Sequence, residues 1–152
     1  MLEVGAAVPT IPVRNDTGDS VSLAAFTGQR VIVFFYPKSD TPACTAEACE
    51  FRDDLGAFSD LGVTVVGVSP DPVKAQAKFK AKFSLPFMLL ADEDHALAEA
   101  FGVWGLKKFM GREYMGVART TFIVEADGTV GHVFEGVTAK GHARQVLDYL
   151  RS

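Results

Sequence analysis

The chain has 152 residues, of which 48% are hydrophobic and 22% charged, with a formal net charge of −4 and two cysteines. A chain of this length forms one domain and buries about 68–70% of the surface that its unfolded form exposes. The acidic balance, without a basic stripe, argues against nucleic acid or a membrane as a partner, and no apolar run approaches the length of a membrane span.

The N-terminal residues 1–5 lack the basic and apolar regions of a signal peptide, so we expect a cytoplasmic protein. In a reducing compartment, two cysteines indicate catalysis rather than a disulfide scaffold. The residues that follow predict an N-terminal hairpin, with short strands at 8–13 and 20–23 around the turn formers at 15–18.

A run of β-branched and aromatic residues at 31–36 predicts a strand that is buried on both faces of a parallel sheet. Pro37 ends this strand. Thr41 can cap a helix that has Pro42 in its first position, where the missing N–H costs nothing. Apolar residues at three- and four-residue spacing predict that this helix continues to about Leu61.

Cys44 lies in the first turn of that predicted helix. The unpaired backbone N–H groups and the positive end of the helix dipole stabilise an anion at this place. A thiolate is such an anion, and it is the reactive form of cysteine. The sequence therefore predicts that Cys44 is a nucleophile held in its thiolate form.

Strands and helices alternate through the rest of the chain. Strands are expected at 63–69, 85–90, 118–125 and 129–135, and helices after Pro72, from 92 to 101 and from 138 to 150. Residues 102–117 are predicted to form a long loop that walls the active site. This pattern predicts an α/β fold in which one domain, residues 1–152, has a central mixed sheet with helices on both faces.

The motif Pro37-x-x-x-Thr41-x-x-Cys44 resembles the active-site signature of the peroxiredoxins, cofactor-free thiol peroxidases with a thioredoxin-like fold. A second cysteine five residues later, Cys49, resembles the bacterioferritin-comigratory or Q-type branch. The resemblance extends over almost the whole chain, including the motifs Val66-Gly67-Val68-Ser69-x-Asp71, Trp104-Gly105-x-Lys107 and Arg119-x-Thr121-Phe122. Ala43 departs from it, because the branch usually has glycine there.

The resemblance implies a role for each residue of the site. Cys44 would attack the peroxide and become a sulfenic acid, while the Thr41 hydroxyl and the first-turn amides would donate to the sulfur or the peroxide. Arg119, carried over from the Arg-x-Thr-Phe motif, would hold the thiolate and a peroxide oxygen together. Pro37 would shield the sulfur from water, and Glu47, one turn after Cys44, would orient Arg119.

Cys49 would then resolve the sulfenic acid as an intramolecular disulfide with Cys44. Five residues of regular helix separate the two Cα atoms by roughly 8–9 Å, whereas a disulfide needs them within about 7 Å. The start of the helix must therefore unwind in each turnover. A thioredoxin-type dithiol would reduce the disulfide again, and the resemblance implies hydrogen peroxide and organic hydroperoxides as substrates, a monomer, and no cofactor or metal.

Other interpretations of these residues remain open. The cysteines could be inert core residues, Thr41 only a cap, and Arg119 a structural ion-pair residue. Two other functions are a dithiol oxidoreductase, disfavoured because the Cys-x-x-Cys spacing is absent, and a non-catalytic redox sensor or holdase. The three histidines, His95, His132 and His142, share no ligand spacing with the cysteines and are expected at the surface or as caps.

Overall fold

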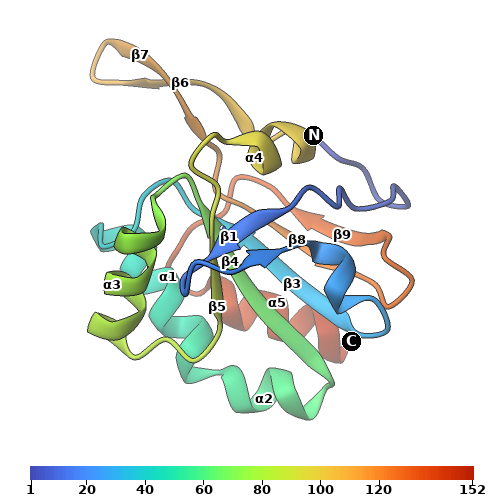
Figure 1. Ribbon diagram of the computed structural model, residues 1–152. Coiled ribbons are helices and arrows are strands. Elements are labelled where there is room, and N and C mark those ends of the chain that lie inside the picture. The colour runs from blue at the N-terminus through green and yellow to red at the C-terminus, as the bar shows by residue number, and fades with distance from the viewer.

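The computed structural model describes all residues, 1–152, and has a seven-stranded mixed sheet in the order β2-β1-β5-β4-β3-β8-β9 (Figure 1). A separate two-stranded sheet pairs β6 with β7. The strands are β1 (Val13–Asn15), β2 (Ser20–Val21), β3 (Arg30–Phe35), β4 (Val63–Ser69), β5 (Met88–Ala91), β6 (Trp104–Phe109), β7 (Arg112–Val117), β8 (Thr120–Val124) and β9 (Val130–Phe134). The helices are α1 (Pro42–Asp53), α2 (Leu55–Asp60), α3 (Val73–Phe83), α4 (Ala96–Phe101) and α5 (His142–Arg151).

Strand β3 lies at the centre of the fold, parallel to β4 and antiparallel to β8. Its side chains alternate between two buried clusters, because successive residues of a strand point to opposite faces. Ile32 and Phe34 join the cluster that contains residues of α1, α2, α3 and α5, whereas Val33 and Phe35 join the cluster that contains residues of α4. The predicted sheet with helices on both faces is therefore confirmed.

The predicted helix over residues 42–61 is wrong in one respect, because it is interrupted at Asp54. Helix α1 ends at Asp53, and α2 begins at Leu55 after Asp54 has left helical geometry with φ −95° and ψ 7°. Phe51 and Phe58 lie on either side of the break and are both fully buried, so the apolar spacing continues across it. Asp54 and Gly56 are poor helix formers, and this was the only sign of the break in the sequence.

Residues 102–117 do not form the predicted loop but the β6-β7 hairpin. Met110 and Gly111 form its turn, with φ values of 51° and 78°, and Phe109 pairs with Arg112. Two consecutive residues with positive φ are typical of the tight turns that match the twist of a hairpin. The usual sequence signal for such a turn is Asn-Gly or Asp-Gly, and Met-Gly does not give it.

The remaining differences concern the ends of elements. The N-terminal hairpin is present, but β1 shares only Val13 with the strand predicted at 8–13, and β2 ends at Val21 rather than at Leu23. The side-chain oxygen of Asn15 accepts hydrogen bonds from the N–H groups of Thr17 and Asp19 in the turn. The helices predicted at 92–101 and 138–150 begin at Ala96 and His142. None of the helices combines the length and apolar character needed to cross a membrane.

Candidate active site

Cys44 lies where the central strand passes into the first helix. Tyr36 follows β3 and is fully buried, and the chain then turns through residues 37–41 before α1 begins at Pro42. Cys44 is the third residue of α1 and only 1% exposed. The first turn of the helix therefore holds its thiol inside the protein, beside backbone N–H groups that have no partner within the helix.

Arg119 reaches this thiol from the neighbouring strand. It precedes β8, which is antiparallel to β3, and the register places Thr120 opposite Phe35. Its Nη2 donates a hydrogen bond to Cys44 Sγ at 3.3 Å, and its Nη1 donates to Glu47 Oε1 at 2.7 Å. One guanidinium thus joins residues that lie 75 and 72 positions away in the sequence.

Glu47 is fully buried one helical turn after Cys44. Burial raises the pKa of its carboxyl to about 7, although the positive charge of Arg119 and the hydrogen bond from it act in the opposite direction. The second carboxylate oxygen, Oε2, is buried without a hydrogen-bond partner. The hydrogen bond between Arg119 and Glu47 therefore fixes the position of both side chains. The raised pKa means that the charge of Glu47 changes close to neutral pH.

Thr41 occupies the cap position of α1, but its hydroxyl does not cap the helix as expected. The hydroxyl donates instead to the Lys38 carbonyl oxygen at 2.8 Å. The hydroxyl therefore does not donate to the sulfur as was expected, because its one proton is used in this bond. Its oxygen lone pairs remain free to accept a hydrogen bond.

A cavity of about 370 Å³ opens beside this loop. Pro37 and Thr41 line one side of it, and residues of the β6-β7 hairpin, among them Trp104 and Tyr114, line the other. The expectation that residues 102–117 wall the active site stays a prediction. They form a hairpin and line this cavity opposite Pro37 and Thr41, but neither Cys44 nor Arg119 is among its lining residues. A cavity of this size accommodates a small peroxide with an organic substituent.

The model of the AhpC/TSA family matches residues 4–133 of this sequence. The chain belongs to the AhpC/TSA family. It is 43% identical over 150 residues to peroxiredoxin Bcp of Bacillus subtilis, an alignment that covers 99% of this chain and 96% of that protein. The same identity, length and coverages hold for peroxiredoxin Bcp of Escherichia coli.

A solved structure of the Xanthomonas campestris bacterioferritin comigratory protein, described with its alkyl peroxide reduction activity, superposes with a TM-score of 0.91. It is 36% identical, and the match covers 99% of this chain and 96% of that one. The chain is accordingly a thioredoxin-like peroxiredoxin, an enzyme of the thiol peroxidase class. These findings confirm both the fold class and the family expected from the sequence.

In this peroxiredoxin, Cys49 lies on the same continuous helix as Cys44. Both cysteines are free thiols, Cys44 buried and Cys49 partly exposed. Helix α1 is thus fully folded when both thiols are free, and it carries both sulfurs.

The sequence did not predict a buried hydrogen-bond network beneath the loop. The Tyr36 hydroxyl donates to Gln76 Oε1 at 2.7 Å, and Gln76 Nε2 donates to Ser69 Oγ at 2.9 Å. Ser69 Oγ donates to Asp71 Oδ2 at 2.6 Å, which also accepts from the Ser39 N–H at 2.7 Å. The network ties the 37–41 loop to β4 and α3, and burial raises the pKa of Tyr36 so that it stays neutral.

His142 is buried, so the expectation that all three histidines lie at the surface or act as caps is wrong for this one. Its Nδ1 lies 2.9 Å from Gln145 Oε1, which can only accept, so Nδ1 carries the proton and Nε2 accepts from the Thr121 hydroxyl at 2.7 Å. Burial lowers its pKa and favours this neutral form. The ring packs edge-on against Phe51 of α1, with centroids 5.8 Å apart.

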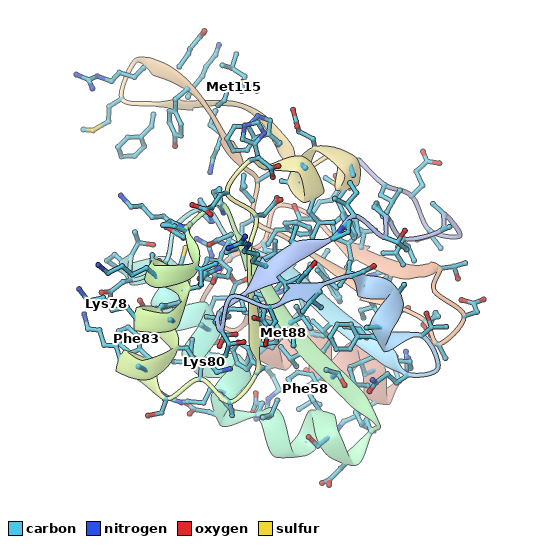
Figure 2. All side chains as sticks on the ribbon, viewed as in Figure 1. Phe58, Lys78, Lys80, Phe83, Met88 and Met115 are labelled. Atoms are coloured by element: carbon cyan, nitrogen blue, oxygen red, sulfur yellow. The ribbon has the colours of Figure 1, made fainter.

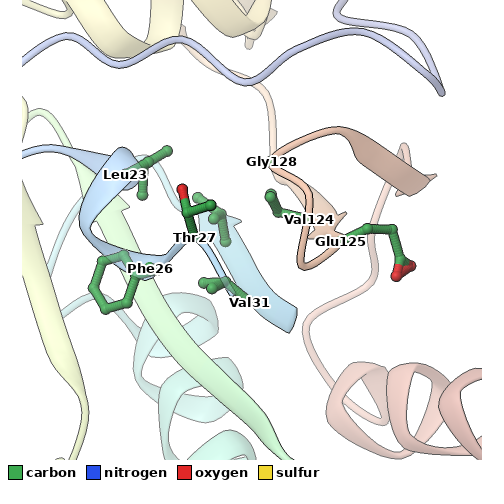
Figure 3. A pocket seen from close by; sticks show the side chains of 8 residues that line it. Leu23, Phe26, Thr27, Val31, Val124, Glu125 and Gly128 are labelled. Atoms are coloured by element: carbon green, nitrogen blue, oxygen red, sulfur yellow. The ribbon is translucent and has the colours of Figure 1, made fainter. Parts of the chain in front are cut away.

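A second cavity lies at the other end of β3, between Val31, Leu23 and Val124 (Figure 3). Its volume is about 10 Å³, hardly enough for one water molecule. It is lined mainly by apolar side chains and contains neither cysteine, so it is a packing defect rather than a substrate site.

Proposed function

We propose that this peroxiredoxin reduces hydrogen peroxide and organic hydroperoxides with Cys44 as the attacking thiolate. The observation that carries the assignment is the contact of Arg119 with both Cys44 Sγ and Glu47. The alkyl peroxide reduction described for the Xanthomonas campestris relative supports the inclusion of organic substrates. The site consists of Cys44, Thr41, Pro37 and Arg119, with Glu47 as a supporting residue.

In the first step the thiolate of Cys44 attacks the terminal oxygen of the peroxide. An S–O bond forms, the O–O bond breaks, and the leaving alkoxide or hydroxide takes up a proton, so that Cys44 becomes a sulfenic acid. Arg119 lies where it can stabilise charge on the sulfur and on an adjacent oxygen, and Thr41 can accept a hydrogen bond from the peroxide. Pro37 borders the cavity beside Thr41 and limits the access of water.

In the second step the Cys49 thiolate attacks the Cys44 sulfur, and the oxygen leaves as water. The two sulfurs cannot meet on an intact helix, since Cα atoms roughly 8–9 Å apart exceed the reach of a disulfide. Helix α1 must therefore unwind, and the contact between Arg119 and Glu47 breaks with it. A thioredoxin-type dithiol then reduces the disulfide, and the reaction needs no cofactor.

We further propose that the enzyme is a monomer, that residues 1–152 form one domain, and that it acts in the cytoplasm. The assignment is tested by steady-state peroxide consumption with dithiothreitol as reductant. We expect Cys44→Ser to lose turnover, because serine provides no thiolate. Cys49→Ser serves as the control that keeps the first oxidation. Substantial turnover by Cys44→Ser would overturn the proposed role of Cys44.

A further inference from the structure

The β6-β7 hairpin carries an apolar surface that the peroxidase reaction leaves unexplained. It forms its own sheet and projects away from the body of the protein (Figures 1 and 2). Its exposed large apolar side chains are Leu106, Phe109, Met110, Tyr114 and Met115, with Phe109 65% and Met110 89% exposed. An isolated two-stranded hairpin is only marginally stable in water, and exposed apolar patches commonly mark interaction sites.

Positive charge accompanies this apolar surface. The hairpin contains Lys107, Lys108 and Arg112 but only one acid, Glu113, which gives it a net charge of +2 in a chain whose net charge is −4. Glu113 lies 3.6 Å from Lys108, and Arg112 has no acidic partner. The surface therefore suits a partner that offers apolar contacts together with carboxylates.

The base of the hairpin forms part of the active-site cavity. Lys107 and Met115 line this cavity on the side opposite Pro37 and Thr41. Trp104 anchors the base, since its ring stacks on His95 with centroids 3.9 Å apart and an interplanar angle of 3°. A molecule seated on the hairpin would thus also cover the cavity beside Pro37 and Thr41, two residues of the loop that leads into α1.

We propose that the β6-β7 hairpin is the docking surface for the dithiol protein that reduces the Cys44–Cys49 disulfide, an inference that rests on the proposed function. A small peroxide needs only the cavity, whereas a protein reductant must cover the surroundings of the disulfide to bring its sulfur into line. The partner's thiolate attacks one sulfur, forms a mixed disulfide and releases the other sulfur as a thiolate. Its second thiolate then displaces the enzyme, which leaves the partner oxidised and both cysteines of the enzyme reduced.

The test compares a protein reductant with a small one. We would measure peroxide turnover with thioredoxin, thioredoxin reductase and NADPH, with glutaredoxin and glutathione, and with dithiothreitol. For Phe109→Ser we expect kcat/KM for the more efficient protein reductant to fall about 10-fold, as for a large interface side chain, while turnover with dithiothreitol is unchanged. Leu61→Ser, an exposed leucine after α2, is the matched control and should behave as wild type.

A second variant tests the proposal independently, in case Phe109→Ser acts by misfolding the hairpin. Arg112→Gln removes one exposed charge without changing the apolar surface, and we expect it to lower kcat/KM for the protein reductant at low ionic strength. Arg144→Gln, an exposed arginine of α5, is its control and should have no effect.

The outcomes separate the docking proposal from the proposed function. Absence of wild-type turnover with dithiothreitol contradicts the peroxidase function itself. If that turnover is present but both hairpin variants keep the wild-type kcat/KM for the protein reductant, the docking proposal is wrong. It is also wrong if neither protein reduces the wild-type enzyme faster than dithiothreitol does, or if the variants impair the dithiothreitol reaction equally.

Discussion

Arg119 connects the Cys44 sulfur to a buried acid, and each of its two terminal nitrogens has a defined partner. Nη2 contacts Cys44 Sγ at 3.3 Å and Nη1 contacts Glu47 Oε1 at 2.7 Å. A planar guanidinium makes both contacts at fixed angles, whereas an ammonium group is a single point of charge. The geometry at this residue therefore depends on the shape of the side chain as well as on its charge.

Replacing Arg119 by lysine should slow the oxidation of Cys44 even though the charge is kept. We expect the second-order rate constant for hydrogen peroxide to fall about 10²–10³-fold, the loss typical of a removed donor to developing charge. Stopped-flow measurement of the first oxidation step gives this constant. Arg144→Lys, on the surface of α5, is the control. An Arg119→Lys variant as fast as wild type would show that the simultaneous contacts with Cys44 Sγ and Glu47 Oε1 are not both needed.

Glu47 should make the stability of the protein depend on pH. Its pKa is raised to about 7 in the folded protein from an ordinary value of 4.5, so the folded state binds more protons than the unfolded state between these values. Its contribution to stability is complete below the unfolded pKa and is lost as the pH rises through the folded pKa. The loss amounts to about 3 kcal/mol for a shift of this size.

The change Glu47→Gln removes this dependence because glutamine does not titrate. We expect the free energy of unfolding of wild type, measured relative to Glu47→Gln, to decrease between about pH 5 and about pH 8. Urea titrations of both proteins at the two pH values provide the comparison. A constant difference between the two proteins would contradict the raised pKa of Glu47.

At the scale of the element, α1 is fastened to the rest of the protein at three points, one of which is the hydrogen bond from Arg52 Nη1 to the Phe83 carbonyl oxygen at 2.8 Å. The Glu47 contact with Arg119 holds its beginning, and the Glu50 carboxylate accepts the Gly141 N–H at 2.8 and 3.0 Å near its end. In the proposed resolution step, unwinding of α1 would break the contact of Glu47 with Arg119 and weaken the contact of Glu50 with Gly141. Asp54 lies between α1 and α2, where its N–H donates to the Glu50 carbonyl oxygen and its own carbonyl oxygen accepts from the Phe58 N–H.

Weakening the contact at Gly141 should speed formation of the disulfide. Glu50→Gln replaces a charge-assisted hydrogen bond by a neutral one, worth about 1 kcal/mol, so we expect resolution to become about 5-fold faster. Rapid quench after one equivalent of peroxide, followed by peptide mapping, measures the Cys44–Cys49 link within one chain. Glu93→Gln, at an exposed position, is the control, and an unchanged or slower resolution would show that Glu50 does not restrain α1.

At the scale of the whole molecule, local patterns predicted most of the fold. The apolar run before Pro37 predicted β3, and the alternation of strands and helices predicted the mixed sheet, because burial on both faces of a sheet leaves a strong pattern. Two of the errors lie where that pattern carries no information. The break at Asp54 preserves the apolar spacing, and the β6-β7 hairpin packs too little apolar surface to alternate clearly.

For the site as well, local sequence predicted one part and tertiary packing determined the rest. The placement of Cys44 in the first helical turn followed from Thr41 and Pro42, which are neighbours in the sequence. Arg119 was named from a family motif, and its distance from the sulfur depends on the pairing of β3 with β8, which no local pattern specifies. The network from Tyr36 to Asp71 and the burial of His142 depend on tertiary packing, and so they were missed.

In the proposed function, peroxide oxidises one sulfur of the molecule first, the buried thiol of Cys44. The most direct test is the mass of the Cys49→Ser variant after one equivalent of hydrogen peroxide, with peptide mapping of the product. We predict the gain of one oxygen atom on the peptide that contains Cys44, held there because no resolving thiol remains. Oxygen on a methionine instead, or a protein of unchanged mass with the peroxide unconsumed, would contradict the account.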